Sequence, residues 1–102
     1  MDTKDDYDKA LKDNAKVVLD FTAGWCGPCK RIGPVFEKLA EENPGIKFFK
    51  VDVDKNEEVA ALEEISAMPT FKFYKDGKKL DFELQGASEE KLKVNVQKLA
   101  DA

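Results

Sequence analysis

Two cysteines separated by two residues are the side chains in this sequence best suited to chemistry. They stand in the run Trp25-Cys26-Gly27-Pro28-Cys29, and the 102-residue chain contains no other cysteine and no histidine. A catalytic triad that needs histidine is therefore excluded. A structural zinc site takes more Cys or His ligands than this chain offers. The pair can exchange with a disulfide, because a thiolate attacks disulfide sulfur.

Three other interpretations of Cys26 and Cys29 stay open from the residues alone. The pair could be half of a zinc site shared by two chains, a purely structural disulfide, or two inert buried thiols. A disulfide with this spacing closes too small a loop to restrict the unfolded chain much. A secreted fold held by disulfides would also contain more cysteines. We therefore expect redox chemistry at this pair.

The elements around the cysteines place Cys26 between a strand and a helix. Residues 17–22 are nearly all apolar and rich in β-branched side chains, which predicts a central strand covered on both faces. After the cysteines, apolar residues recur at helical spacing as far as the Asn-Pro-Gly run at 43–45. The first N–H groups of a helix are unpaired, so a Cys26 thiolate there would be stabilised. Cys29, one turn further on, could then attack a mixed disulfide.

The remaining segments alternate between helices and strands, as in an α/β domain. In chain order we expect a helix from Thr3 to about 14, a strand over 17–22, a helix from the cysteines to about 43, a strand over 46–53, a helix over 57–65, strands over 71–74 and 80–84 joined by an Asp76-Gly77 turn, and a last helix capped by Ser88. The first two strands should be parallel and the hairpin antiparallel. Helical residues expected to face the core include Val59, Leu62, Leu92, Val96 and Leu99.

The composition is that of one domain spanning residues 1–102. Apolar residues make up 42% of the chain and charged residues 37%, with a net charge of −4. The lysines are scattered among acidic residues, which argues against a nucleic-acid surface. No apolar run is long enough to span a membrane. The first six residues show no secretory signal, so we expect a cytoplasmic protein.

Several segments together resemble the thioredoxin family. Residues 17–30, which include Trp25-Cys26-Gly27-Pro28-Cys29, resemble the active-site segment of thioredoxins. The similarity continues through Lys50-Val51-Asp52-Val53-Asp54, Met68-Pro69-Thr70, Lys75-Asp76-Gly77 and Gly86-Ala87. The resemblance implies an α/β thioredoxin fold, with a central mixed sheet of four strands, or five with a short first strand, flanked by four helices. It also implies reduction of disulfides in client proteins.

The resemblance implies roles for four residues in the chemistry. Cys26 would be the nucleophile and Cys29 the resolving thiol. Asp20 would be a buried carboxylate that helps to move the Cys29 proton, and Lys50 would face it. The residues agree in part, because Asp20 interrupts an apolar strand where burial raises a carboxyl pKa. The alternatives are an Asp20 that reaches solvent and a plainly exposed Lys50.

The resemblance also implies a docking surface around a cis-proline, Pro69. The backbone before this proline would pair with a bound client segment as an added strand does. The other residues of this surface would be Trp25, Gly27, Pro28, Ala67, Met68, Gly86 and Ala87. Without the resemblance, the alternative for Trp25 and Met68 is packing in the core.

By resemblance, the partners are an NADPH-dependent thioredoxin reductase and disulfide-containing clients. We expect no metal and no bound cofactor beyond a redox-active Cys26–Cys29 disulfide. Two alternative functions stay open: an oxidase or isomerase on the same fold, and a binding module whose partner senses the redox state.

Only Met1-Asp2-Thr3 precede the first predicted helix, so the family's first edge strand should be stunted or missing. We expect a monomer, with a weak dimer through the exposed 46–49 edge as the alternative.

Overall fold

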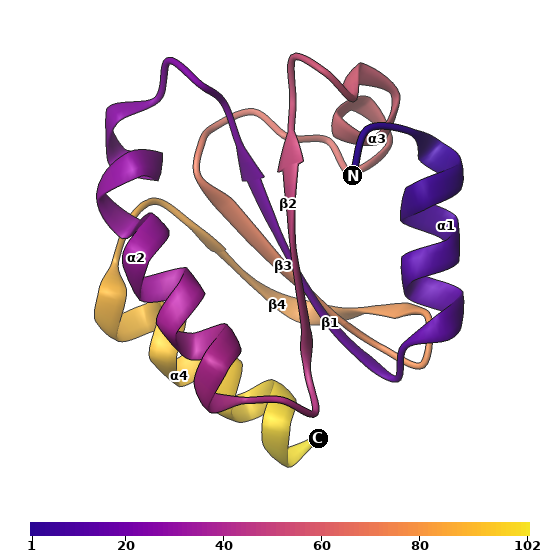
Figure 1. The fold of residues 1–102 in the computed structure, drawn as a ribbon, viewed down its shortest axis with the longest axis vertical. Helices are drawn as coiled ribbons and strands as arrows, with labels where there is room; N and C mark the ends of the chain where they lie inside the picture. The colour runs from indigo at the N-terminus through magenta and orange to yellow at the C-terminus, as the bar shows by residue number, and fades with distance from the viewer.

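Four helices and four strands follow one another in the order that the sequence predicts. The computed structural model describes all 102 residues (Figure 1). The elements are α1 (Lys4–Asp13), β1 (Lys16–Thr22), α2 (Gly27–Glu42), β2 (Lys47–Asp52), α3 (Glu57–Leu62), β3 (Thr70–Lys75), β4 (Lys78–Gln85) and α4 (Glu89–Asp101). None of the helices has the length and apolar character needed to cross a membrane.

The strands form one mixed sheet in the order β2-β1-β3-β4. β1 pairs in parallel with β2 and antiparallel with β3, and β3 pairs antiparallel with β4. These directions confirm the prediction. β1 is therefore an interior strand, and its residues 17–21 are all buried, as the apolar run indicates. Asp20 lies opposite Lys50 on β2 and Phe71 on β3.

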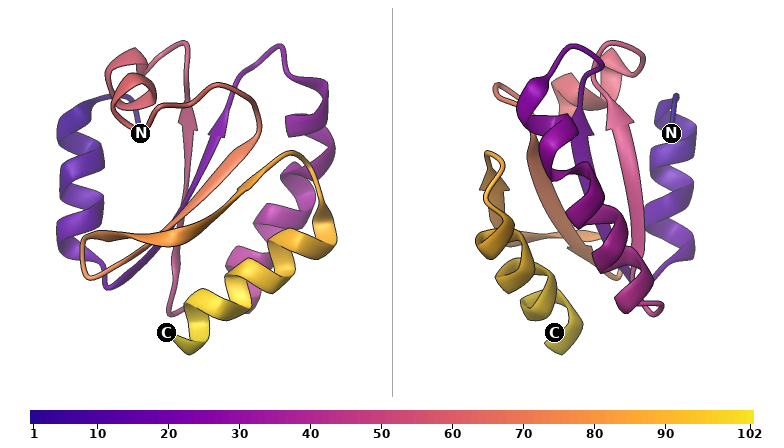
Figure 2. Two further views of the ribbon diagram at one scale, coloured as in Figure 1. Left: turned by 180° about the vertical axis from the view of Figure 1, so that it is seen from behind. Right: turned by 60° about the vertical axis from the view of Figure 1, so that its left-hand side comes forward.

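Helices cover both faces of the sheet (Figures 1 and 2). α2 and α4 lie over one face, where Val18 and Phe36 belong to a buried cluster. α1 and α3 lie over the other face, where Val17 and Leu19 belong to a second cluster. Alternate residues of β1 thus enter opposite layers, because successive side chains of a strand point to opposite faces.

α3 is shorter than predicted, and one of its residues faces solvent instead of the core. Val59 is buried as expected, but Leu62, predicted to face inward, is 54% exposed. The helix ends at Leu62 because the chain turns at Glu64, whose φ of 56° is left-handed. Glu63 is buried in place of Leu62. The spacing of apolar residues gave a wrong prediction for Leu62, because a helix of six residues is too short to define an apolar face.

The N-terminal expectations are confirmed in the structure. Thr3 caps α1, and its side chain accepts a hydrogen bond from the Asp6 N–H. No strand precedes α1, so the sheet has four strands and β2 forms one of its edges.

In the β3–β4 hairpin, Asp76 and Gly77 have φ values of 53° and 82°. Two positive φ values are those of the predicted two-residue turn.

Candidate active site

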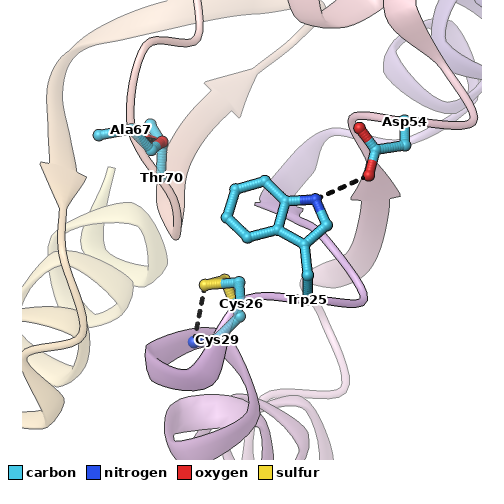
Figure 3. Close-up of a disulfide and its surroundings, with 6 residues drawn as sticks. All are labelled: Trp25, Cys26, Cys29, Asp54, Ala67 and Thr70. Atoms are coloured by element: carbon cyan, nitrogen blue, oxygen red, sulfur yellow. Dashed lines mark hydrogen bonds between the residues drawn. A yellow bond between two sulfur atoms is a disulfide. The ribbon is translucent and has the colours of Figure 1, made fainter.

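Cys26 and Cys29 form a disulfide at the first turn of α2 (Figure 3). Cys26 is the N-cap residue, and its sulfur accepts a hydrogen bond from the Cys29 N–H at 3.2 Å. Each residue is at most 5% exposed. Because the two sulfurs are bonded to each other, the structure does not support a shared zinc site or a pair of inert free thiols. In the reduced state the same N–H would face the Cys26 sulfur.

The local backbone explains why Cys26 sits at the helix start. β1 ends at Thr22 and the chain turns, with the Cys26 N–H donating to the Ala23 carbonyl at 3.1 Å. The helix then begins, and its first turn holds Pro28, which lacks an N–H that would in any case be unpaired there. The positive end of the helix dipole is thereby directed at Cys26.

Trp25 extends into solvent beside the disulfide (Figure 3). Its side chain is exposed, with 68% of the residue accessible, which excludes the core-packing alternative for this residue. The indole Nε1 donates a hydrogen bond of 2.9 Å to the Asp54 carboxylate, which follows β2. The ring is therefore held in one place at the surface by a residue from a different part of the chain.

The backbone around Pro69 lies on the other side of the cysteines. The Met68–Pro69 peptide bond is cis, as the resemblance implies. Met68 is half-buried and packs against the cluster formed by Ala23, Cys26 and Cys29. The Gly86 N–H donates to the Pro69 carbonyl at 2.8 Å, which brings Gly86 and the following Ala87 to the same region.

Two backbone N–H groups beside Pro69 are available to a partner. The N–H groups of Ala67 and Met68 make no hydrogen bond within the protein. The Ala67 carbonyl accepts from the Thr70 hydroxyl at 2.7 Å, so this stretch is nevertheless held in place. An extended peptide could add to this edge through main-chain hydrogen bonds.

Asp20 is buried behind the disulfide, as the sequence predicts. It is only 2% exposed, and its Oδ1 has no hydrogen-bond partner. Burial raises its pKa from 3.8 to about 7, and the positive charge of Lys50 acts in the opposite direction. The carboxyl group therefore changes its charge near neutral pH.

A cavity of about 380 Å³ lies next to both Asp20 and Cys29. Asp20, Cys29 and Lys50 all line it. The Lys50 side chain is 47% exposed, and its Nζ pairs with the Glu37 carboxylate at 3.1 Å. Lys50 is thus in register with Asp20 and lines the same cavity, but its direct ionic partner is Glu37. The exposed alternative describes this side chain better than an inward lysine.

Three residues of the site were given no role from the sequence: Asp54, Glu37 and Thr70. Asp54 and Thr70 fall within the segments that resemble thioredoxins, yet no spacing rule links either to Trp25 or Ala67. Glu37 lies on the exposed side of a helix, where an acidic residue is ordinary. No group of three or more Cys, His, Asp or Glu side chains is close enough to hold a metal ion.

The fold and the paired cysteines define a dithiol–disulfide oxidoreductase built on a four-stranded α/β sheet. Comparison with known proteins agrees, because residues 1–98 match the family model described as Thioredoxin. The chain belongs to the thioredoxin family.

Individual relatives and structures support this assignment along nearly the whole chain. A thioredoxin of Geodia cydonium is 55% identical over 98 residues, which cover 94% of this chain and 92% of the relative. A structure of Plasmodium falciparum thioredoxin matches with a TM-score of 0.93 at 42% identity, covering 96% of this chain and 95% of that chain. A chain from a structural study of thiol resolution in yeast mitochondrial 1-Cys peroxiredoxin via glutathione/thioredoxin systems matches with a TM-score of 0.88 at 37% identity, covering 93% and 89%.

Proposed function

We propose that the protein reduces disulfide bonds in client proteins, with Cys26 as the attacking thiolate and Cys29 as the resolving thiol. The Cys26 thiolate bonds to one client sulfur, and the other client sulfur leaves as a thiolate. The Cys29 thiolate then bonds to the Cys26 sulfur, and the bond between Cys26 and the client breaks. The client gains two electrons and becomes a dithiol, while Cys26 and Cys29 become a disulfide.

One observation carries this assignment of roles to the cysteines. The Cys26 sulfur lies at the N-cap of α2 and accepts the Cys29 N–H, whereas Cys29 lies inside the first turn. Backbone N–H groups at a helix start favour negative charge on the sulfur that they face. The thiolate needed for attack is therefore favoured at Cys26.

In this proposal Asp20 is the proton acceptor for Cys29. Cys29 must lose its proton before it attacks the mixed disulfide. Asp20 lines the same cavity as Cys29, and burial brings its pKa to about 7. A carboxylate with a pKa near the working pH is well matched to this proton transfer. The cavity leaves room for water between the two groups.

The client docks, in this proposal, along the exposed residues around the disulfide. Trp25 lies beside the disulfide (Figure 3), and Met68 packs against the cluster that contains both cysteines. The N–H groups of Ala67 and Met68 make no hydrogen bond within the protein. The small residues Gly27, Pro28, Gly86 and Ala87 leave space for a client backbone to approach. Pro69 supports this docking edge through its hydrogen-bonded carbonyl.

The resemblance supplies the proposed partners. An NADPH-dependent thioredoxin reductase would return the Cys26–Cys29 disulfide to the dithiol, and no bound cofactor is needed because the cysteines carry the electrons. The structural similarity to a chain from the peroxiredoxin study supports proteins whose redox-active thiols have formed disulfides as clients. We expect a cytoplasmic location, since a reductant of this kind acts where thiols are kept reduced.

Reductase-coupled reduction of insulin tests the proposal. The wild-type protein should support NADPH-dependent reduction, and Cys26→Ser should abolish it. Cys29→Ser should instead trap a mixed disulfide between Cys26 and the client, which mass spectrometry would detect. The matched control is Ser88→Ala, which removes a hydroxyl that caps α4 and leaves both cysteines in place.

Other outcomes would support the alternative functions. A binding module would keep its partner interaction and cellular role in Cys26→Ser, and it would show no turnover in the wild type. An oxidase or isomerase would have a redox potential well above that of a reductant. Either result would contradict the reductase proposal.

A further inference from the structure

Lys72 is a buried lysine that the proposed reaction does not use. It lies in β3, and its side chain is only 6% exposed. An ammonium group rarely enters a protein interior without partners, because losing its hydration is costly. The partners of Lys72 should therefore indicate why this position holds a charge.

Lys72 is bound to the residue that follows α3. Its Nζ donates a hydrogen bond of 2.7 Å to the Glu63 carbonyl and lies 3.6 Å from a carboxylate oxygen of Glu63. A second carboxylate, that of Glu83 on β4, is also 3.6 Å away. Glu63 is itself buried and accepts a hydrogen bond from the Tyr7 hydroxyl of α1. The group thus joins two helices to two strands of the sheet.

Glu63 is also the first residue of the segment that leads to the cis-proline. We call residues 63–69 the docking segment, since they connect α3 to β3 and end at Pro69. This segment contains no helix or strand. It includes Ala67 and Met68, whose N–H groups have no hydrogen bond within the protein.

Carbonyl groups fix the docking segment at both of its ends. The Pro69 carbonyl is held by the Gly86 N–H at one end. At the other end, the Glu63 carbonyl is held by Lys72. The last carbonyls of a helix lack partners within the helix, so this oxygen needs a donor from elsewhere. An apolar side chain at position 72 could fill the space but could not bind this oxygen.

We propose that Lys72 is a positioning residue for client docking: by binding Glu63 it fixes the start of the docking segment and so orients the Ala67 and Met68 N–H groups. This inference rests on the proposed function, because it requires that a client backbone pairs beside Pro69. Buried ion pairs often add little net stability compared with apolar residues of similar size. A role in orienting the docking segment accounts for the buried ammonium group of Lys72, which a contribution to packing does not.

Single-turnover kinetics with two kinds of disulfide test the proposal. The pre-reduced protein is mixed with insulin, whose backbone can dock, or with a small aromatic disulfide such as 5,5′-dithiobis(2-nitrobenzoate), which cannot pair along the segment. Lys72→Met should lower the rate constant with insulin about fivefold or more, in line with the cost of misplacing a bound group. The rate constant with the small disulfide should stay within about twofold, since the cysteines keep their geometry.

Two further variants separate docking from stability. Lys72→Met combined with Glu63→Gln removes the ion pair without leaving a lone buried charge, and it should show the same selective loss if Lys72→Met folds poorly. Val96→Ala is the destabilised control, because Val96 is a buried residue of α4, which covers the other face of the sheet. It should change neither rate constant.

The outcomes are distinct for the two proposals. Equal rate constants for wild type and the double variant with insulin would overturn the role of Lys72, as would an equal loss in Val96→Ala. Failure of the proposed function would appear earlier, as wild-type protein that does not reduce insulin at all. Backbone ¹⁵N relaxation gives an independent check, because residues 64–68 should become more mobile in Lys72→Met and in the double variant but not in Val96→Ala.

Discussion

The carboxyl group of Asp20 loses its hydration on folding and gains no hydrogen bond at Oδ1. Its folded pKa of about 7 lies above the ordinary value of 3.8. Between these two pH values the folded protein holds a proton that the unfolded chain releases. The contribution of Asp20 to folding stability therefore falls as the pH rises through this interval and is lost above about pH 7.

We predict that Asp20→Asn stabilises the protein at pH 8. A pKa difference of about three units corresponds to about 4 kcal/mol at most. Urea unfolding of the oxidised wild type and of Asp20→Asn, measured between pH 4 and pH 8, should show a difference in unfolding free energy that widens with pH. A constant difference across this range would contradict the burial of an ionisable Asp20.

Lys50 should affect the same carboxyl group through its charge. Lys50 lowers the Asp20 pKa against the larger effect of burial, so Lys50→Met should raise it. The measurement is a ¹³C NMR titration of the Asp20 carboxyl in the two proteins. Lys47→Met is the control, because Lys47 is an exposed lysine of the same strand that does not line the cavity. An equal effect of both substitutions would show that proximity to Asp20 is irrelevant.

At the scale of elements, the β3–β4 hairpin depends on a backbone conformation that few residues adopt. Gly77 has a φ of 82°, and a Cβ there would meet only the Leu11 carbonyl, at 3.6 Å. The space is sufficient, so the cost of a larger residue comes from the backbone conformation. Gly77→Ala should lower the unfolding free energy by about 1–2 kcal/mol.

Chemical denaturation of Gly77→Ala checks this value, with Gly45→Ala as the control. Gly45 has open space around its Cβ position and no positive φ. Its replacement should have little effect on the unfolding free energy. A similar loss in both variants would mean that the left-handed backbone at Gly77 is not the cause of the effect.

The elements differ in how well local patterns predict them. β1 and the turn at Asp76 and Gly77 were predictable, because burial on both faces and two-residue turns leave clear local signals. The burial of Glu63 after α3 was not, because it depends on contacts with residues outside the helix, Lys72 and Tyr7. For the same reason the sequence could place Lys50 next to Asp20 but could not reveal its pairing with Glu37.

At the scale of the whole molecule, β2 forms one of the two unpaired edges of the sheet. β2 pairs only with β1, and its residues Lys47 and Lys50 are exposed. Exposed lysines are a common device against edge-to-edge association. We therefore expect a monomer, as predicted from the sequence.

Sedimentation velocity and amide exchange check this expectation together. The protein should sediment as a monomer at micromolar concentrations, and those β2 amides that do not bond to β1 should exchange rapidly. A dimer with these amides protected would indicate pairing through β2. A monomer with the same amides protected would contradict the exposed edge.

Trp25 has a practical consequence at this scale, because it is the only tryptophan among the 102 residues. Its indole is exposed, fixed by Asp54 and adjacent to Cys26. All of the intrinsic tryptophan fluorescence of the molecule therefore originates next to the bond that the reaction makes and breaks. The emission should change between the disulfide and dithiol states, so the protein carries its own optical indicator of redox state and needs no label.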